Sequence, residues 1–384
     1  MTILAEKEKC TGCGSCAISC PEKCILMDTD AQGFRYPTIN NEKCIHCSLC
    51  EKKCPVITPE EVKSENIFLA AKNKNIEIRK QSTSGGVFTA LAQYCINNGG
   101  IVCGAAYDSD NHVVHSLFSD EVHIAKMRGA KYSQSYSEHT FLEIREMLKN
   151  NRWVLFSGTP CQVAALRSYL GKDYNTLILV DIVCHGVPSP LIWDKYLADL
   201  NRNSEAKLKS INLRSKVSGW SRYNYSTEFV YENGKKIVIP QNENYFMRGF
   251  VSNLYLRPSC SHCSFKGVDR VSDFTLGDYW GIWNQYAEFD DNVGTSMIII
   301  HGTKGRMLWE NIKDQFDIIE VSQEQAIHEN PSAVVASKQN EKCEVFWKLI
   351  DQGNSVNDAV DKCLIQPVTN SFVKRSLRWI KRHL

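Results

Sequence analysis

A cysteine pattern that occurs twice near the start of this chain constrains its fold more than any other feature. Each copy has the spacing Cys-x2-Cys-x2-Cys-x3-Cys followed by proline, first from Cys10 to Cys20 and then from Cys44 to Cys54. This is the bacterial type of binding run for two [4Fe–4S] clusters, in which the fourth cysteine of each copy reaches across to the other cluster. The predicted ligands are Cys10, Cys13, Cys16 and Cys54 for one cluster, and Cys44, Cys47, Cys50 and Cys20 for its partner.

A zinc site and a disulfide framework are the two alternatives to iron–sulfur clusters. A tetrahedral zinc site also uses pairs of cysteines, but it takes four ligands and needs no fourfold run repeated with proline. A disulfide framework is disfavoured because nothing marks the chain as secreted: residues 1–7 lack the apolar core and cleavage site of a signal peptide. Seventeen cysteines without an export signal instead favour metal ligation in a reducing cytoplasm.

Composition narrows the class of protein. Of the 384 residues, 43% are hydrophobic and 23% are charged, as in a soluble globular protein. The net charge of +2 gives no general attraction to nucleic acid or to membranes. No apolar run approaches the roughly 20 residues that span a bilayer. The sequence therefore predicts a cytoplasmic protein that has no nucleic-acid partner.

Beyond the cysteine runs, strand and helix patterns alternate. Strands are expected at 67–71, 100–107, 153–157 and 176–184, and helices at 84–98, 161–170 and 189–200. The pattern becomes strand-rich from 207 to 239, adds strands at 272–280 and 295–301, and turns helical at 340–364. Such alternation is typical of an α/β layered domain with a mixed or parallel sheet. The predicted fold class is thus α+β and α/β: a small ferredoxin-like domain followed by a mixed-sheet α/β domain.

Four parts of the chain are predicted. Their bounds are 1–60 for the ferredoxin-type domain, 65–205 and 206–365 for the two parts of the α/β domain, and 366–384 for a basic tail. In the tail, Val373, Leu377, Ile380 and Leu384 fall on one helical face, and five lysines and arginines between 374 and 382 supply the charge. A basic amphipathic helix of this kind can lie peripherally on the inner face of a membrane or pack on the protein itself or a partner.

A third group of cysteines lies outside the ferredoxin-type domain. Cys161 and Cys184 each follow a predicted strand, and Cys260 and Cys263 form a Cys-x2-Cys pair. Because loops at the carboxyl ends of parallel strands converge on one crevice, Cys161 and Cys184 are expected to face the same side. The four thiols would hold a third cluster. The alternatives are a structural zinc site, or two buried thiols and an unrelated zinc-like pair.

Clusters carry one electron at a time, so an enzyme that links them to hydride chemistry needs a converter, usually a flavin. The turn Ser82-Thr83-Ser84-Gly85-Gly86 leads into a helix and offers N–H groups and hydroxyls to a phosphate or a flavin edge, or simply caps that helix. Lys131, beside Tyr132, is a second candidate contact, or an ordinary surface lysine. The absence of GxGxxG and GxxxxGK[ST] motifs argues against a Rossmann nicotinamide site and against nucleoside triphosphate hydrolysis.

These motifs, in this order, resemble the coenzyme F420 hydrogenase/dehydrogenase beta-subunit family, over roughly residues 1–300. The matching segments are 82–86, Gly129-Ala130-Lys131-Tyr132, Gly158-Thr159-Pro160-Cys161-Gln162, Cys184-His185-Gly186, Cys260-x2-Cys263 and 272–281. The resemblance implies a flavin, usually FAD, beside a [4Fe–4S] cluster on Cys161, Cys184, Cys260 and Cys263. It implies cofactor contacts at Ser82, Thr83, Ser84, Gly85, Gly86, Lys131, Tyr132, Gly158 and Thr159.

Members of this family pass electrons between a reduced deazaflavin, a ferredoxin or a partner protein and an acceptor. Some resemble reductases of organic substrates, and a bacterial subset accompanies enzymes of surface-polysaccharide synthesis. This chain departs from the archaeal subunits by its own ferredoxin unit, its longer C-terminal region and the basic, aromatic stretch 213–221. That stretch either lines a pocket for an anionic or glycan-like molecule or is a strand and turn with surface charge.

Three functions remain open at this point. In the first, a redox partner such as a ferredoxin supplies electrons that pass through the clusters to a flavin, which reduces an organic substrate, with His185 or Lys131 delivering a proton. In the second, the chain is an electron-transfer subunit that oxidises a reduced deazaflavin for a partner and has no substrate of its own. In the third, it is a non-catalytic zinc protein, which the repeated four-cysteine runs disfavour.

Overall fold

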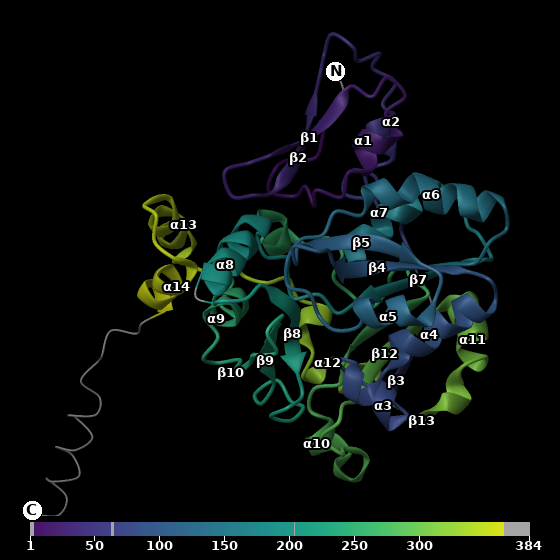
Figure 1. Cartoon of the computed structure of the whole chain (residues 1–384). Helices are drawn as coiled ribbons and strands as arrows, with labels where there is room; N and C mark the ends of the chain where they lie inside the picture. Colours follow the sequence, from purple (N-terminus) through teal and green to yellow (C-terminus); the bar gives the residue numbers. More distant parts are fainter. Residues whose placement is uncertain (1–3, 63–64, 203, 365–384) are drawn as a thin grey trace, which may run out of the picture.

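The computed structural model describes residues 4–62, 65–202 and 204–364, so the predicted basic tail lies outside the described residues. Residues 4–60 form a separate small unit at one end of the molecule, above α6 and α7 (Figure 1). Its elements are α1 (Ser15–Ser19), β1 (Ile25–Thr29), β2 (Arg35–Ile39) and α2 (Leu49–Lys52). Strands β1 and β2 pair antiparallel, with Ile25 opposite Ile39. We call residues 4–60 the ferredoxin unit.

The centre of the molecule is a mixed sheet of eight strands in the order β13-β3-β12-β11-β7-β6-β4-β5. Its strands are β3 (Asn66–Asn73), β4 (Ile101–Tyr107), β5 (Val113–Phe118), β6 (Val154–Gly158), β7 (Leu177–Ile182), β11 (Phe274–Asp278), β12 (Ser296–His301) and β13 (Phe316–Glu320). Strands β4, β6, β7 and β11 run parallel, and the remaining pairs are antiparallel.

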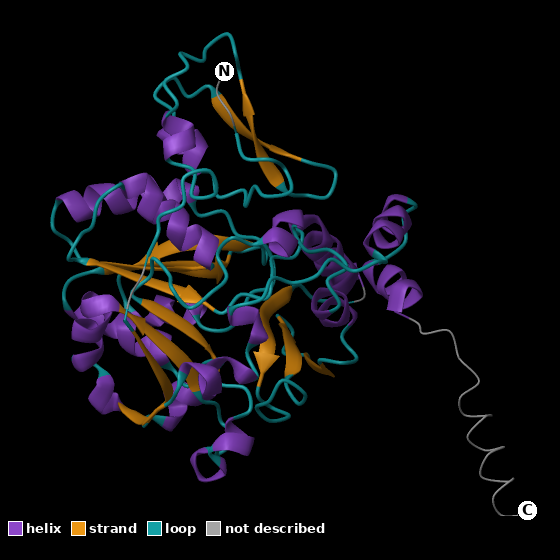
Figure 2. Ribbon diagram, turned by 180° about the vertical axis from the view of Figure 1, so that it is seen from behind, coloured by secondary structure: helices purple, strands orange, loops and turns teal. Residues whose placement is uncertain are grey.

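Helices cover both faces of this sheet, as Figure 2 shows. The helices on the two faces are α3 (Ile76–Gln81), α4 (Val87–Asn97), α5 (Glu121–Met127), α6 (Glu138–Lys149), α7 (Pro160–Leu170), α10 (Ile282–Gln285), α11 (Gly302–Glu310) and α12 (Gln323–His328). On β12, Ile298 and Ile300 pack on the side of α4, α5 and α11, whereas Met297 and Ile299 pack on the side of α10 and α12. This alternation buries both faces, as expected for strands that lie inside a layered domain.

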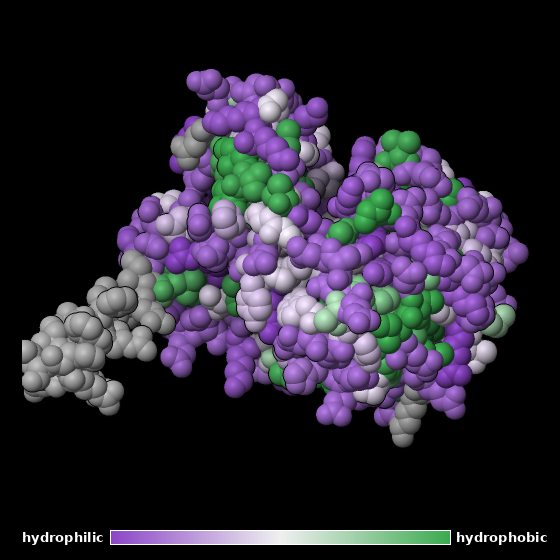
Figure 3. Space-filling model, turned by 90° about the horizontal axis from the view of Figure 1, so that it is seen from below, coloured by the Kyte–Doolittle hydropathy of each residue, from purple (hydrophilic) through white to green (hydrophobic). Residues whose placement is uncertain are grey.

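A smaller antiparallel sheet and a group of helices pack beside the main sheet. They are β8 (Leu208–Ser215), β9 (Ser226–Tyr231), β10 (Lys236–Pro240), α8 (Pro190–Arg202), α9 (Tyr245–Val251), α13 (Cys343–Asp351) and α14 (Val356–Leu364). Their shared core is rich in aromatic side chains, among them the fully buried Trp193, Phe229 and Phe246. In the described residues, no helix is long and apolar enough to cross a membrane. The face seen from below is mostly hydrophilic, with hydrophobic residues in separate patches (Figure 3).

The structure confirms the predicted fold class, and the expected strands and helices occur close to their predicted positions. Three differences stand out. The segment 340–364 forms two helices, because Gly353 adopts a left-handed φ of 84° between α13 and α14. Strands β5 and β13 and several helices, among them α3, α5, α6, α9 and α12, were not predicted. Strands from both predicted parts of the α/β domain, 65–205 and 206–365, join a single sheet.

Candidate functional site

The cysteines of the ferredoxin unit gather in two groups. One cavity is lined by the first predicted set, Cys10, Cys13, Cys16 and Cys54, together with apolar residues such as Met27 and Val56. A second cavity is lined by the other set, Cys20, Cys44, Cys47 and Cys50, and also by Cys24, whose Sγ lies 3.3 Å from that of Cys20. The fourth cysteine of each run therefore crosses to the other group. We call these groups the first set and the second set.

The loop of the first set owes its shape to two glycines. Gly12 and Gly14 adopt left-handed φ angles of 66° and 73°, which side chains rarely tolerate. A Cβ at Gly14 would lie 2.6 Å from Cγ of Glu138 on α6. The loop therefore lies tightly against the α/β domain. Burial raises the pKa of the Cys13 thiol to about 11. Because only a thiolate binds iron, metal binding here has to offset the cost of a buried negative charge.

The third group of cysteines comes from three separate loops. Cys161 lies in the first turn of α7, Cys184 follows β7, and Cys260 and Cys263 lie in and just after the short 3₁₀ turn Pro258–His262. Burial raises the pKa of Cys161, Cys184 and Cys260 to about 12, and in each case neighbouring thiols of this group add to the rise. The fold thus brings together thiols that are far apart in sequence. We call these four residues the third set.

Two sulfur atoms of the third set have polar contacts with neighbouring groups. The Thr159 hydroxyl lies 3.1 Å from Cys161 Sγ, and the Val187 N–H donates to Cys260 Sγ at 3.3 Å. Thr159 also forms a capping box with Gln162, which fixes the start of α7 and so the position of Cys161. Such contacts to sulfur tune the potential of an iron–sulfur cluster. No three His, Cys, Asp or Glu side chains of the described residues converge as ligands of a single metal ion.

A cavity of about 720 Å³ opens beside the third set, at the carboxyl ends of β6, β7 and β11. Cys161 and Cys260 line it, and so does Cys13 of the first set. Ligands of α/β proteins typically bind in a crevice at the carboxyl ends of parallel strands. Most of the predicted flavin contacts also line it: Ser82, Thr83, Ser84, Gly86, Lys131, Tyr132, Gly158 and Thr159. We call this space the large cavity.

Gly85 is the one predicted flavin contact that does not line the large cavity. A Cβ at this position would lie 2.3 Å from the carbonyl oxygen of Ala71 and 2.7 Å from the Ser296 nitrogen. Its N–H donates to Ser296 Oγ at 2.9 Å. Gly85 therefore lets the turn lie directly on β3 and β12, and the residues on either side of it face the cavity.

One end of the large cavity suits a phosphate. Helix α4 begins after Gly86, and no side chain caps its first N–H groups. Arg128 lies beside this helix start, because its Nε donates to Thr89 Oγ1 at 3.0 Å. Free N–H groups at a helix start, combined with a nearby cation, form a natural binding site for anions. Sequence reasoning found the turn but missed Arg128, which directly precedes the matched segment 129–132.

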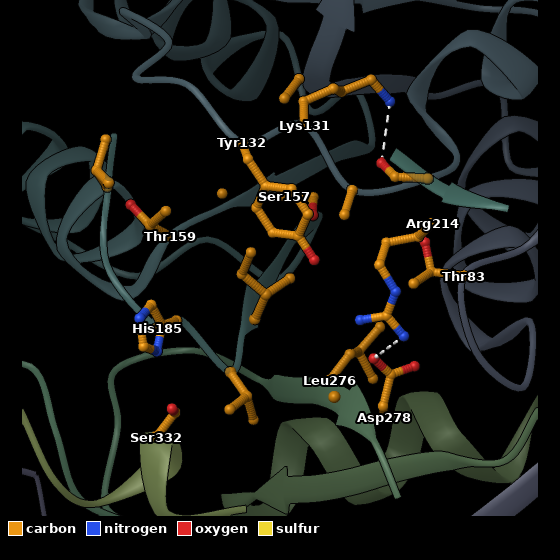
Figure 4. Close-up of a pocket in the computed structure, with 18 of the residues that line it drawn as sticks. Thr83, Lys131, Tyr132, Ser157, Thr159, His185, Arg214, Leu276, Asp278 and Ser332 are labelled. Atoms are coloured by element: carbon orange, nitrogen blue, oxygen red, sulfur yellow. Dashed lines mark hydrogen bonds and ion pairs between the residues drawn. The ribbon is translucent and has the colours of Figure 1, made fainter. Parts of the chain in front are cut away.

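A buried ion pair lines another part of the cavity. Arg214, near the end of β8, lies 3.1 Å from Asp278 at the end of β11, and the two side chains point toward each other in Figure 4. The Arg214 guanidinium lies 4.1 Å from the ring centre of Tyr225 and 4.9 Å from that of Trp280. Its Nε is buried and has no partner among the described residues. A buried donor without a partner is uncommon in folded proteins and calls for an explanation.

Comparison with known proteins gives two matches to one family. Residues 68–140 match the N-terminal model of the coenzyme F420 hydrogenase/dehydrogenase beta subunit, and residues 151–326 match its C-terminal model. The chain belongs to the coenzyme F420 hydrogenase/dehydrogenase beta-subunit family. Residues 9–57 match the 4Fe-4S dicluster domain. This member of the family is therefore an iron–sulfur oxidoreductase that transfers electrons, as the resemblance predicted.

Individual proteins are similar to parts or to most of this chain. An uncharacterized ferredoxin of Methanocaldococcus jannaschii is 36% identical over 53 residues, which are 14% of this chain and 68% of that protein. An uncharacterized polyferredoxin-like protein of the same organism is 37% identical over 60 residues, 14% of this chain, and the match spans only 36% of its length. A chain of the F420-reducing [NiFe] hydrogenase complex from Methanosarcina barkeri aligns with a TM-score of 0.44 and 18% identity, over 79% of this chain and 92% of that one.

The two residues that this family member was predicted to use for proton delivery both line the large cavity. Lys131 Nζ donates to the carbonyls of Met127, Arg128 and Gly129 at 3.0, 2.7 and 3.1 Å, so it holds its own loop together (Figure 4). Burial lowers the pKa of Lys131 to about 7. Lys131 is thus a half-buried loop residue whose ammonium group is held by its own backbone, in contrast to the ordinary surface lysine that the sequence left open.

His185 follows Cys184 of the third set and lies on the opposite side of Tyr132 from Arg214 (Figure 4). Its Nε2 lies 2.6 Å from Asn253 Oδ1, and its ring packs edge-on against Phe250. Burial lowers the pKa of His185, which favours the neutral imidazole. Proton delivery by His185 stays a prediction.

The stretch 213–221 contributes to the cavity and to the surface. Arg214 lines the cavity, whereas Val217 is exposed. Lys216 Nζ donates to the carbonyls of Arg79, Ser84 and Val293, so it supports the turn of the cavity wall. Part of this stretch therefore lines the cavity and part lies at the surface, while its binding of an anionic or glycan-like molecule stays a prediction.

Proposed function

We propose that the protein is an iron–sulfur flavoprotein in which electrons pass between two ferredoxin-type [4Fe–4S] clusters, a third [4Fe–4S] cluster and a flavin, FAD or a related one. The flavin reduces or oxidises an organic substrate or a deazaflavin. One observation carries this proposal: a single cavity is bordered by Cys13 of the first set, by Cys161 and Cys260 of the third set, and by all but one of the predicted flavin contacts.

The residues of the cavity fit a flavin. The start of α4 with Thr83, Ser84 and Arg128 would hold its phosphates, because N–H groups, hydroxyls and a cation meet there. Apolar residues such as Val183 and Leu276 also line the cavity and would help to exclude water from it. A bound flavin supplies the conversion between one-electron transfer and hydride transfer.

The four thiols of the third set fit a cluster. They are free cysteines without disulfide partners, they come together from separate parts of the chain, and two of their sulfur atoms already have polar contacts, with the Val187 N–H and the Thr159 hydroxyl. The neighbouring Cys13 adds to the raised pKa of Cys161, so the first and third sets border each other. Closely spaced clusters of this kind let electrons cross from the ferredoxin unit to the cavity.

The substrate side of the cavity is proposed to bind a glycan-related or anionic molecule. Arg222, Tyr223 and Gln241 line this part of the cavity, and the Tyr223 side chain is exposed. An aromatic face combined with polar groups recognises sugars and charged molecules by stacking and hydrogen bonding. A role in polysaccharide biosynthesis would follow from such a substrate.

A second candidate is an electron-transfer subunit that oxidises reduced coenzyme F420 or another donor for a partner and has no substrate of its own. The surface near the second set favours it, because Cys47 and Ile45 are both exposed there. A redox partner, ferredoxin or similar, would approach a cluster at this surface. We place either version of the protein in the cytoplasm, with contact to the inner membrane face through the tail 366–384.

The proposal is tested by Cys161→Ala, with Cys343→Ala as the matched control. Cys343 is a buried cysteine of α13 outside all three sets. We expect Cys161→Ala to lose the third cluster and to stop reduction of the bound flavin by a reduced ferredoxin, measured anaerobically by the loss of flavin absorbance. Cys343→Ala should behave as wild type. Full iron content and unchanged flavin reduction in Cys161→Ala would refute the proposed relay.

A further inference from the structure

Arg257 is a buried arginine at the boundary between the ferredoxin unit and the α/β domain, and only 2% of it is exposed. Its backbone belongs to the loops of the third set. The Arg257 N–H donates to the Val187 carbonyl at 2.8 Å, and the Arg257 carbonyl accepts from the Cys260 N–H at 2.9 Å. The position of this residue is therefore fixed by the α/β domain, three residues before a predicted cluster ligand.

The side chain of Arg257 crosses into the ferredoxin unit. Its Nε donates to the Cys10 carbonyl at 2.8 Å, and its Nη2 donates to the Arg35 carbonyl at 2.9 Å. Its Nη1 donates to Gln134 Oε1 at 3.0 Å. A Cβ at Gly12 would lie 2.7 Å from this Nη1, so the glycine leaves just enough room for the guanidinium. One side chain thus joins the loop of the first set to the loop that carries Cys260.

The positive charge of Arg257 has no carboxylate partner among the described residues. All three of its hydrogen-bond acceptors are neutral, and the rings of Phe34 and Tyr36 lie 5.3 and 4.3 Å from the guanidinium carbon. Other buried arginines of the chain are paired: Arg214 lies 3.1 Å from Asp278, and Arg270 lies 3.2 Å from Asp181. Burying a charge is costly unless an opposite charge or strong hydrogen bonds compensate it.

A [4Fe–4S] cluster with four thiolate ligands supplies that opposite charge. We infer that Arg257 is the counter-cation of the cluster on Cys10, Cys13, Cys16 and Cys54, and that it raises the reduction potential of this cluster. The inference rests on the dicluster part of the proposed function. The cluster is anionic and becomes more so when it takes up one electron, with no bond made or broken and no proton moved. A fixed, buried cation therefore stabilises the reduced form more than the oxidised form.

The position of Arg257 indicates the direction of electron flow that the raised potential would favour. Its charge lies on the side of the first set that faces Cys260 and the large cavity. A raised potential at this cluster draws electrons from the second set, at the outer surface, toward the α/β domain. Arg257 is thus a positioning residue, since it acts on the relay through its charge and its hydrogen bonds and not by contact with the substrate.

The test is a redox titration of the intact holoprotein, followed by electron paramagnetic resonance, for wild type, Arg257→Gln and Arg257→Lys. In Arg257→Gln we expect one cluster to shift to a more negative potential by a tenfold change in its equilibrium constant or more, which is about 59 mV for one electron. Arg257→Lys keeps the charge, so its potential should stay nearer to that of wild type. Arg306→Gln removes the same charge from a half-exposed arginine on α11, at a remote site, and should shift no potential.

A second variant covers the case in which Arg257→Gln does not retain iron. Gln134→Glu places a carboxylate beside Nη1 of Arg257 and neutralises its charge while the arginine stays in place. We expect the same cluster to shift in the same direction. Unchanged cluster potentials in an iron-replete Arg257→Gln or Gln134→Glu protein would overturn the inference. If the third cluster of the proposed function does not form, the wild-type protein will contain about eight irons per chain, since two [4Fe–4S] clusters hold eight. That result is independent of any shift in the cluster potentials.

Discussion

The ferredoxin unit and the α/β domain both gather cysteines, but they do so by different means. In the ferredoxin unit the buried apolar cluster consists of Cys24, Ile25 and Cys50, and much of its remaining lining is cysteine as well. In the α/β domain the third set is held by loops of an eight-stranded sheet whose core is aliphatic and aromatic. The first region needs its clusters in order to fold, whereas the second builds its site on a scaffold that is stable without metal.

Removal of iron is expected to show the largest difference between the ferredoxin unit and the α/β domain. After anaerobic chelation we expect residues 4–60 to lose their structure, because so few apolar side chains remain to hold them, while the sheet of the α/β domain persists. Amide hydrogen exchange would report the loss of protection in the ferredoxin unit. All eight tryptophans follow residue 150, seven of them between 153 and 347 in the α/β domain and Trp379 in the tail, so their fluorescence does not report the ferredoxin unit and should stay close to that of the intact protein.

Retained protection of 4–60 in the iron-free protein would contradict the comparison, and so would a loss of the tryptophan signal. Zinc added back in place of iron serves as the control, since it tests whether any thiol-binding metal restores the unit or only iron with sulfide.

A smaller effect, the pH dependence of stability, is expected in the α/β domain. His115 is buried beside Phe156, and its ring nitrogens contact the Ser157 carbonyl and Ser135 Oγ. Burial lowers the pKa of His115 to about 4. As the pH falls below about 6.5, His115 therefore binds a proton in the unfolded chain but stays neutral in the folded chain until the pH nears 4. The stabilising contribution of the neutral imidazole is complete above that pH and is lost as the pH falls toward 4.

The full effect is on the order of 3 kcal/mol, from the size of the pKa shift. His115→Gln keeps a polar side chain but does not titrate, so its free energy of unfolding should fall less between pH 6.5 and 4 than that of wild type. Urea unfolding followed by tryptophan fluorescence measures this in the α/β domain. Parallel pH curves for the two proteins would show that His115 is not the group responsible.

The two regions also differ in how far the sequence predicts them. In the ferredoxin unit the spacing of the cysteines was enough to predict which of them lie together. The structure places Cys54 with the first set and Cys20 with the second, as the crossed pattern requires. In the α/β domain the alternation of strands and helices predicted the layers, and the strand ends placed Cys161 and Cys184 near each other.

What the sequence did not predict depends on long-range packing. Arg257, Arg128 and the pair of Arg214 with Asp278 become notable only when separate loops meet at the large cavity. No local pattern distinguishes a buried arginine from an exposed one. The family motif around Asp278 and the basic stretch that contains Arg214 each pointed to one half of the ion pair, but the two residues lie on strands of different sheets, β8 and β11, that meet only in the folded chain.

The central claim is that three clusters and a flavin share one chain. The most direct test is the content of iron, zinc and flavin per chain in anaerobically purified protein. The account predicts about twelve irons, from three clusters of four, with one flavin and no zinc. About eight irons without flavin, or zinc in place of the third cluster, would contradict it and leave only the ferredoxin unit as an electron carrier.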